Sequence, residues 1–189
     1  MIDPTQEQVD ALTELLNIGV GRGATVLNTM LASHILLRVP YVRLMQASDL
    51  MEEIEKLGKD RLATVNLRFK GAFSGMVELV FPEKDASTLI SAVTGEEPLA
   101  DDLDTLRAGA LCEVGNVVLN SVMGTISNML SLGFTYSVPI FAEGNSVELW
   151  RQEDAGDETI LLFARTFFQI EKFKIEGSII VFLQIGALD

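Results

Sequence analysis

Residues 10–40 read DALTELLNIGVGRGATVLNTMLASHILLRVP, and residues 109–139 read GALCEVGNVVLNSVMGTISNMLSLGFTYSVP. Shifting the chain by 99 residues lays the first stretch on the second, and each copy reads Glu-x-x-Asn, then 22 residues, then Pro. The matched positions include these pairs: Glu14 and Glu113, Asn17 and Asn116, Met30 and Met129, Pro40 and Pro139. Because several polar and structural positions agree at one offset, the chain is predicted to carry one unit twice.

Each unit is predicted to begin with a long helix, at about 5–33 in the first copy and 102–131 in the second. Apolar residues at spacings near three and four form the buried stripe of the first helix: Val9, Leu12, Leu16, Val20, Leu27 and Leu31. Asp3 is the expected N-cap, with Pro4 at the first helical position. The other predicted elements are short helices at 48–57 (capped by Ser48) and 85–93, and strands at 35–40, 63–69, 75–81, 148–151, 159–170 and 177–185.

These elements predict an α+β fold. A long helix and a hairpin cannot bury their apolar faces alone, so the two halves are expected to pack side by side, with two long helices on a mainly antiparallel sheet and a pseudo-two-fold axis between them. We expect residues 1–189 to form a single domain made of two repeats, about 5–99 and 102–189. The alternative is two separate domains on a flexible linker, which is disfavoured because no Pro/Ser-rich segment divides the chain.

Composition excludes several classes of function. The net charge is −13, and such an acidic surface repels polyphosphate, so nucleic acid is an unsuitable partner. Cys112 is the only cysteine and His34 the only histidine, which excludes most zinc sites and most His-based catalysis. We expect Cys112 to be a core residue and His34 to end the first helix. No signal peptide or membrane-spanning stretch is visible, so a cytoplasmic location is expected.

A polar stripe runs along each long helix. The spacing places Asp10, Glu14, Asn17 and Gly21 on one face of the first helix, and the corresponding face of the second carries Gly109, Glu113, Asn116, Asn120 and Gly124. A single copy is most simply a solvated helix face; two copies in the same register favour a function. Gly19 and Gly23 are expected to serve helix–strand packing inside the fold.

The chemistry open to Glu plus Asn is narrow. No His or Lys accompanies either pair, so a base-activated nucleophile is not indicated. One carboxylate and one amide make a poor metal site, and no metal or cofactor of its own is expected. A side-chain amide can align water for in-line attack on phosphorus. The stripes therefore suit a protein that completes the active site of a partner.

The pattern Asp10-x-x-x-Glu14-x-x-Asn17-x22-Pro40 resembles the signature of the CheC/CheX/FliY family of CheY-phosphate phosphatases. The second copy matches except at its first position, where the family carries Asp or Ser and this chain has Gly109. The resemblance covers nearly the whole chain, and its two motifs make it most like the two-site CheC branch. It implies a CheC-like duplicated fold.

The resemblance also implies an activity, which is removal of phosphate from the aspartyl-phosphate of a CheY-like response regulator in chemotaxis or related two-component signalling. Asn17 and Asn116 would position the attacking water, while Glu14 and Glu113 would pair with a lysine of the regulator. Mg2+ would belong to the partner receiver domain. Further residues expected to contact the partner are Asp10, Gly21 and Asn120. The receptor deamidase CheD is implied as a second partner, and the change at Gly109 weakens the expectation for the second site.

Two other functions stay open at this stage. The chain would be a non-catalytic adaptor if it held a phosphorylated receiver or CheD without speeding phosphate loss. It would be a structural or sensory domain if the polar stripes were only solvated, and charge reversal at Glu14 and Glu113 would then change nothing.

Overall fold

The described residues form one sheet and five α-helices. The computed structural model describes residues 5–38, 41–55, 60–95, 103–150 and 160–185. The strands are β1 (Ile35–Leu37), β2 (Tyr41–Gln46), β3 (Leu62–Gly71), β4 (Ser74–Pro82), β5 (Phe134–Tyr136), β6 (Ile140–Gly144), β7 (Ile160–Ile170) and β8 (Ile175–Ile185). The helices are α1 (Gln6–Leu31), α2 (Leu50–Glu55), α3 (Glu83–Thr94), α4 (Leu103–Leu130) and α5 (Ser146–Trp150), with a 3-10 turn at Ala47–Asp49 before α2.

The sheet is antiparallel throughout its described pairs, as predicted. Its order is β1-β7-β8-β4-β3-β5, with β2 also pairing with β7 and β6 with β3. The order α1-β1-β2-α2-β3-β4 recurs as α4-β5-β6-α5-β7-β8, while α3 has no counterpart among the described residues. The central β4–β8 pair sets Glu78 opposite Ile180, which marks the middle of the duplicated arrangement.

The two halves exchange their edge strands. Strands β1 and β2 of the first half pair with β7 of the second, and β5 and β6 of the second pair with β3 of the first. The single sheet with two long helices on it is confirmed, and the exchange of strands between the halves adds to that expectation. Each half thus supplies edge strands to the sheet of the other, and these pairs satisfy backbone groups along the outer edges of β3 and β7.

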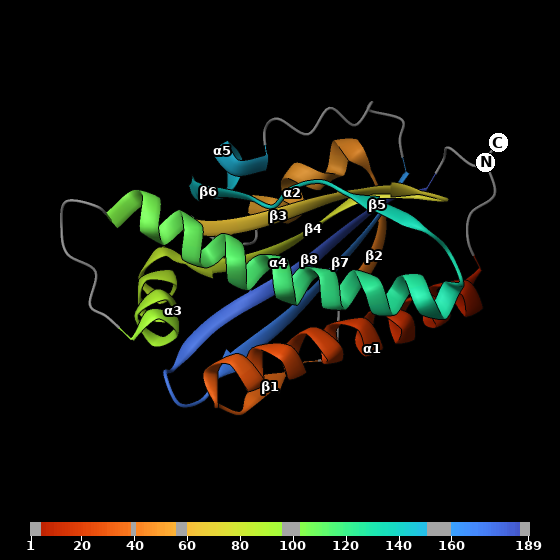
Figure 1. Cartoon of the computed structure of the whole chain (residues 1–189). Helices are drawn as coiled ribbons and strands as arrows, with labels where there is room; N and C mark the ends of the chain where they lie inside the picture. Colours follow the sequence, from red (N-terminus) through yellow and green to blue (C-terminus); the bar gives the residue numbers. More distant parts are fainter. Residues whose placement is uncertain (1–4, 39–40, 56–59, 96–102, 151–159, 186–189) are drawn as a thin grey trace.

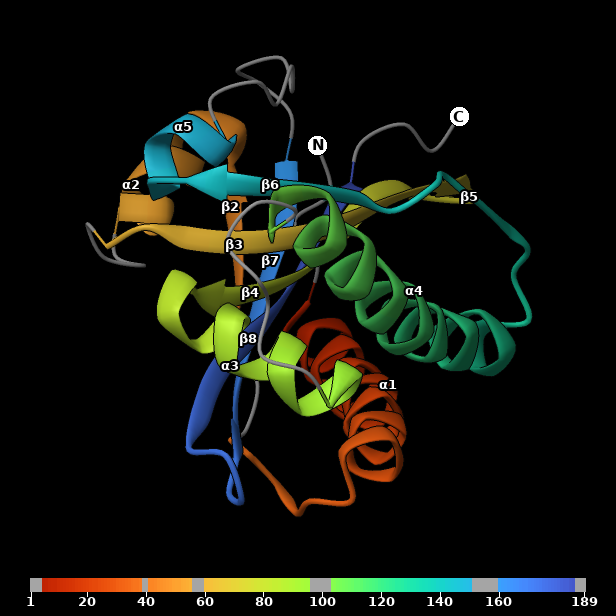
Figure 2. The ribbon, with the colours of Figure 1, turned by 60° about the vertical axis from the view of Figure 1, so that its left-hand side comes forward.

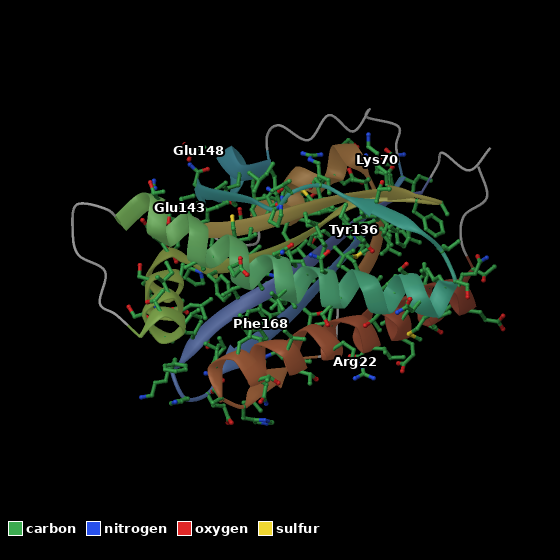
Figure 3. The ribbon with its side chains drawn as sticks, viewed as in Figure 1. Arg22, Lys70, Tyr136, Glu143, Glu148 and Phe168 are labelled. Carbon is green, nitrogen blue, oxygen red and sulfur yellow. The ribbon has the colours of Figure 1, made fainter. Side chains whose placement is uncertain are left out.

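Helices cover the two faces of the sheet unequally. The long helices α1 and α4 lie side by side on one face, with α3 beside them, and the short helices α2 and α5 lie on the other (Figures 1 and 2). The larger core lies under the long helices and includes Phe168 of β7 (Figure 3). The ring of Phe168 packs edge-on against that of Phe81 of β4. A smaller core surrounds the buried Trp150 under α2 and α5.

Glycine determines how closely the long helices approach. A Cβ atom on Gly23 would lie 2.7 Å from Cγ2 of Val122, and one on Gly19 would lie 3.1 Å from the Val122 carbonyl oxygen. Both positions are therefore packing glycines, but they pack helix against helix and not helix against strand as predicted. Gly21 between them differs, since no heavy atom lies within 4 Å of the position of its Cβ.

By length and composition alone, one segment of the described chain, Ala108–Leu130 in α4, could cross a membrane. Leu111, Val118 and Leu119 of this segment are buried in the larger core. This burial is what the core helix of a folded domain shows.

Several local predictions are wrong. Helix α1 begins at Gln6, and its N-cap is Thr5, which exchanges hydrogen bonds with Gln8. Asp3 and Pro4, the predicted cap and first residue, lie outside the described residues. It ends at Leu31 with a left-handed Ala32, which leaves His34 outside the helix. Ser48 lies in the 3-10 turn before α2 rather than at its cap.

The strand predicted at 148–151 is wrong as well, because Ser146–Trp150 is helix α5. Asn145 and Glu148 exchange hydrogen bonds there: the Glu148 amide donates to Asn145 Oδ1 (2.9 Å) and the Asn145 amide to Glu148 Oε2 (3.1 Å). The prediction also missed β2, β5 and β6.

Candidate functional site

The first motif lies on the outer face of α1. Glu14 and Asn17 are exposed, while Leu15 and Leu16 between them are buried against the sheet. Asp10, one turn earlier, is also exposed, and its Oδ1 accepts a hydrogen bond from Gln6 Nε2 (2.9 Å). Arg22 further along α1 points away from α4 (Figure 3). The first motif is thus presented to solvent on a helix whose other face is fixed by the core.

The second motif occupies the corresponding place on α4. Glu113 is exposed and Asn116 half-buried, while Val114 and Gly115 between them are buried. Gly109 is exposed, and a Cβ there would have no neighbour within 4 Å, so its lack of a polar side chain reflects no packing demand.

The two motifs lie toward opposite ends of the pair formed by α1 and α4. Helices α1 and α4 run in opposite directions (Figure 1), and their register follows from Gly23 against Val118 and Val122 and Gly19 against Val122 and Ile126. In that register Asn17 and Asn116 are offset by about ten residues, or about 15 Å along the helix axes. A partner that engages one Asn in its own active site therefore cannot engage the other with the same site.

An exposed β-branched residue follows each Asn directly. Ile18 is 37% exposed and Val117 is 39% exposed, and the two occupy equivalent places in the repeat. Neither residue belongs to the polar stripe predicted from the sequence. A signal was present, because both copies read Asn followed by Ile or Val at the same register. Single exposed apolar side chains are common on protein surfaces, so it is their repetition beside the motif that singles out Ile18 and Val117.

The repeated spacing to proline also has a structural reason in the second copy. Cys112 Sγ, next to Glu113, donates a hydrogen bond to the Pro139 carbonyl oxygen at 3.9 Å. The residues on either side of this proline, Val138 and Ile140, are 79% and 53% exposed. The 22-residue spacing thus returns the chain to the motif and adds an apolar flank to it. Pro40 lies outside the described residues.

Cys112 is half-buried rather than fully in the core. Burial raises the pKa of its thiol, and a backbone hydrogen bond lowers it by a smaller amount. A thiol with a raised pKa is a weak nucleophile near neutral pH, so Cys112 has a packing role beside Glu113.

The two copies differ in what surrounds the Asn. Asn120 lies one turn after Asn116, and its Nδ2 donates to both Oδ1 and the backbone carbonyl of Asn116, each at 2.7 Å. The equivalent of Asn120 in the first copy is Gly21, which has no side chain to donate. The residues predicted to contact a partner thus include one, Asn120, that contacts the motif Asn itself.

The chemistry of the site remains that of amides and carboxylates. Within the described ranges no group of three or more His, Cys, Asp or Glu side chains is placed to hold a metal ion. The segments 10–21 and 109–120 contain no His, Lys or Arg. Each motif can therefore accept and donate hydrogen bonds and carry one negative charge, and any cation must come from a partner.

Comparisons with known proteins agree with this picture. No protein-family model matches the chain. The CheY-P phosphatase CheC of Bacillus subtilis is 26% identical over 181 residues, which span 91% of this chain and 86% of CheC. The crystal structure of Thermotoga maritima FliY matches with a TM-score of 0.74 and 21% identity over 98% of this chain and 93% of that one.

A further solved structure contains a partner. It is the complex of CheX with CheY, BeF3 and Mg2+ from Borrelia burgdorferi, which matches with a TM-score of 0.57 and 18% identity over 89% of this chain and 96% of that one. These comparisons confirm the resemblance that the two motifs indicate: over nearly its whole length the chain is similar to the CheC/CheX/FliY family.

Proposed function

We propose that this protein removes phosphate from the aspartyl-phosphate of a CheY-like response regulator. The observation that carries the proposal is the presentation of Glu-x-x-Asn twice, each time on the solvent face of a long helix held by the core. The similarity to a CheY-P phosphatase and to a CheX solved in complex with CheY supports it. A fold alone does not define an activity, so the proposal rests on the motif.

Each motif residue has a role in this proposal. Asn17 or Asn116 enters the active site of the regulator and aligns a water molecule for in-line attack on phosphorus. Glu14 or Glu113 pairs with a cation of the regulator and fixes the register, while Ile18 or Val117 covers the contact from water. Mg2+ would be held by the regulator. The protein would act in the cytoplasm, where such regulators work, and a CheD-type deamidase would be a second partner.

The decisive experiment measures the decay of a phosphorylated receiver domain with and without the protein. Asn17→Ala combined with Asn116→Ala should lower the rate of phosphate release by about a hundredfold or more, the scale of losing one preorganised polar group in an active site. Each single variant should keep the activity of the other site. Far-UV circular dichroism on the double variant checks that the fold is intact.

The same measurement separates the adaptor hypothesis from the phosphatase. An adaptor would bind a receiver activated with beryllofluoride, a stand-in for the acyl phosphate, without speeding decay of the phosphorylated form. Undiminished phosphate release by the double Asn variant would show that the motifs do not carry the reaction.

A further inference from the structure

Asn116 is held in one orientation before any partner arrives. The Asn120 side-chain nitrogen donates to Asn116 Oδ1 and to the Asn116 backbone carbonyl, each at 2.7 Å, so one amide group bridges the side chain and the main chain of the motif residue. Both residues are half-buried. An Asn at i+4 that bonds back to residue i is a contact a helix supports well.

Asn17 lacks this restraint. Its side chain is exposed, and the residue one turn later is Gly21. The space above Gly21 is open, since no heavy atom lies within 4 Å of its Cβ position, so packing does not explain the glycine. The duplicated sites therefore differ at the position that orders the motif Asn.

We propose that Asn120 is a positioning residue that pre-orders the Asn116 amide and makes the second site the faster of the two per encounter. The inference rests on the proposed function, because it concerns the water-aligning group of that site. It reverses the ranking of the two sites that Gly109 implies. Orientation of the reacting amide acts on the chemical step, whereas a polar side chain at position 109 would act on docking.

The physical reason is the freedom of an amide side chain. A free Asn rotates about two side-chain bonds and exchanges the places of its oxygen and nitrogen, and most of these arrangements cannot align water. The bond from Asn120 occupies one lone pair of Asn116 Oδ1 and leaves the second lone pair and both N–H donors available. Ordering one such side chain in advance is expected to raise the rate about three- to tenfold.

The test uses proteins with one working site. In the Asn17→Ala background, Asn120→Asp keeps the size of the side chain but replaces the donor with an acceptor. It should lower kcat for phosphate release about three- to tenfold; a rise in KM with kcat unchanged would assign Asn120 to partner contact, as the sequence predicts, and would overturn the positioning role. In the Asn116→Ala background the same substitution should change neither quantity.

A gain-of-function arm uses the first site. In the Asn116→Ala background, Gly21→Asn should raise kcat, while Gly21→Ala, which adds the same Cβ and helix preference without an amide, should not. Equal kcat for Asn120→Asp and its parent would overturn the inference. A rise in kcat for Asn120→Asp would overturn it too, because the held orientation would then be the unproductive one.

A readout on the free protein separates this inference from the proposed function. The side-chain 15N–1H signals of Asn116 should show restricted motion compared with those of Asn17, and Asn120→Ala should remove the difference, because Ala offers the Asn116 amide neither a donor nor an acceptor. Loss of the difference with no phosphatase activity in the wild type would refute the proposed function but leave the positioning intact. Equal mobility of the two amides in the wild type would overturn the positioning itself.

Discussion

The contact between α1 and α4 makes a strong prediction about two glycines on the same helix. A Cβ on Gly23 would lie 2.7 Å from Val122 Cγ2, 3.3 Å from Val118 Cγ1 and 3.4 Å from the Val118 carbonyl oxygen. A Cβ on Gly21 would meet nothing within 4 Å. We expect Gly21→Ala to stabilise the fold and Gly23→Ala to be less stable than Gly21→Ala.

The magnitude follows from the difference between the two variants. Replacing a mid-helix Gly by Ala stabilises a helix by up to about 1 kcal/mol, and both variants receive this gain. Only Gly23→Ala forces atoms into a filled contact, which costs about 1–3 kcal/mol. The gap between the two unfolding free energies is therefore expected to be about 1–3 kcal/mol, and at about 2–4 °C per kcal/mol for a chain of this size the gap in Tm is about 2–12 °C.

Urea or thermal unfolding followed by circular dichroism measures the stability of both variants and of the wild type. In a Val122→Ala background the nearest clash is removed, so the gap should shrink. Equal stability of Gly21→Ala and Gly23→Ala would refute the helix contact described above. A gap that persisted at full size in the Val122→Ala background would show that Val122 is not its cause.

Two further predictions concern the surface of the motifs. Glu14→Lys with Glu113→Lys should weaken binding of a beryllofluoride-activated receiver at least about tenfold, because an expected attraction becomes a repulsion. Glu→Gln at both positions should have a smaller effect. Unchanged binding by the Lys variant would favour polar stripes that are merely solvated. Cys112 should react with a disulfide reagent at pH 8 more slowly in the folded chain than in urea, since its raised pKa means that the folded chain holds the thiol proton to higher pH and offers less thiolate. Equal rates in the two conditions would contradict the burial of Cys112 beside Pro139.

The sequence predicted the fold well where local and repeated patterns agree. The stripe of Leu16, Val20 and Leu27 predicted α1 correctly because helical spacing is visible in a single segment. The strands β7 and β8 were equally readable as long runs of Ile, Val and Phe. The division into repeats at about 5–99 and 102–189 stays a prediction.

The elements that were missed depend on strands far along the chain or on capping residues at a helix start. Strand β2, which follows Pro40 in the sequence, lies at the sheet edge and pairs with β7, where Arg165 lies opposite Tyr41. The pairing partner of β2 is therefore far along the chain. Strand exchange between halves cannot be read from either half alone. The α5 error had a local remedy, because Asn145 followed three residues later by Glu148 is a capping signature at the start of a helix.

The polar residues of the candidate site could be predicted from the sequence, but the differences between its two copies could not. Spacing alone placed Glu14 and Asn17 on one exposed face, and the structure brings Glu113 and Asn116 to the equivalent face of α4. The hydrogen bonds of Asn120 could be identified only in the structure, because i+4 spacing allows a contact without specifying which atoms make it. The roles of these residues remain proposals.

The exchange of strands also determines how the two sites can be studied. Pro139 and Ile140, beside the second motif, begin the stretch in which Ile140 pairs with Asn66 of β3, a strand of the first half. In the same way β1, which follows α1, pairs with β7 of the second half. Cutting the chain between the halves would therefore leave each long helix without part of the sheet that supports it. The two sites have to be separated by point substitutions at Asn17 and Asn116, which lie on the solvent side of the helices, where the exchange of strands is unaffected.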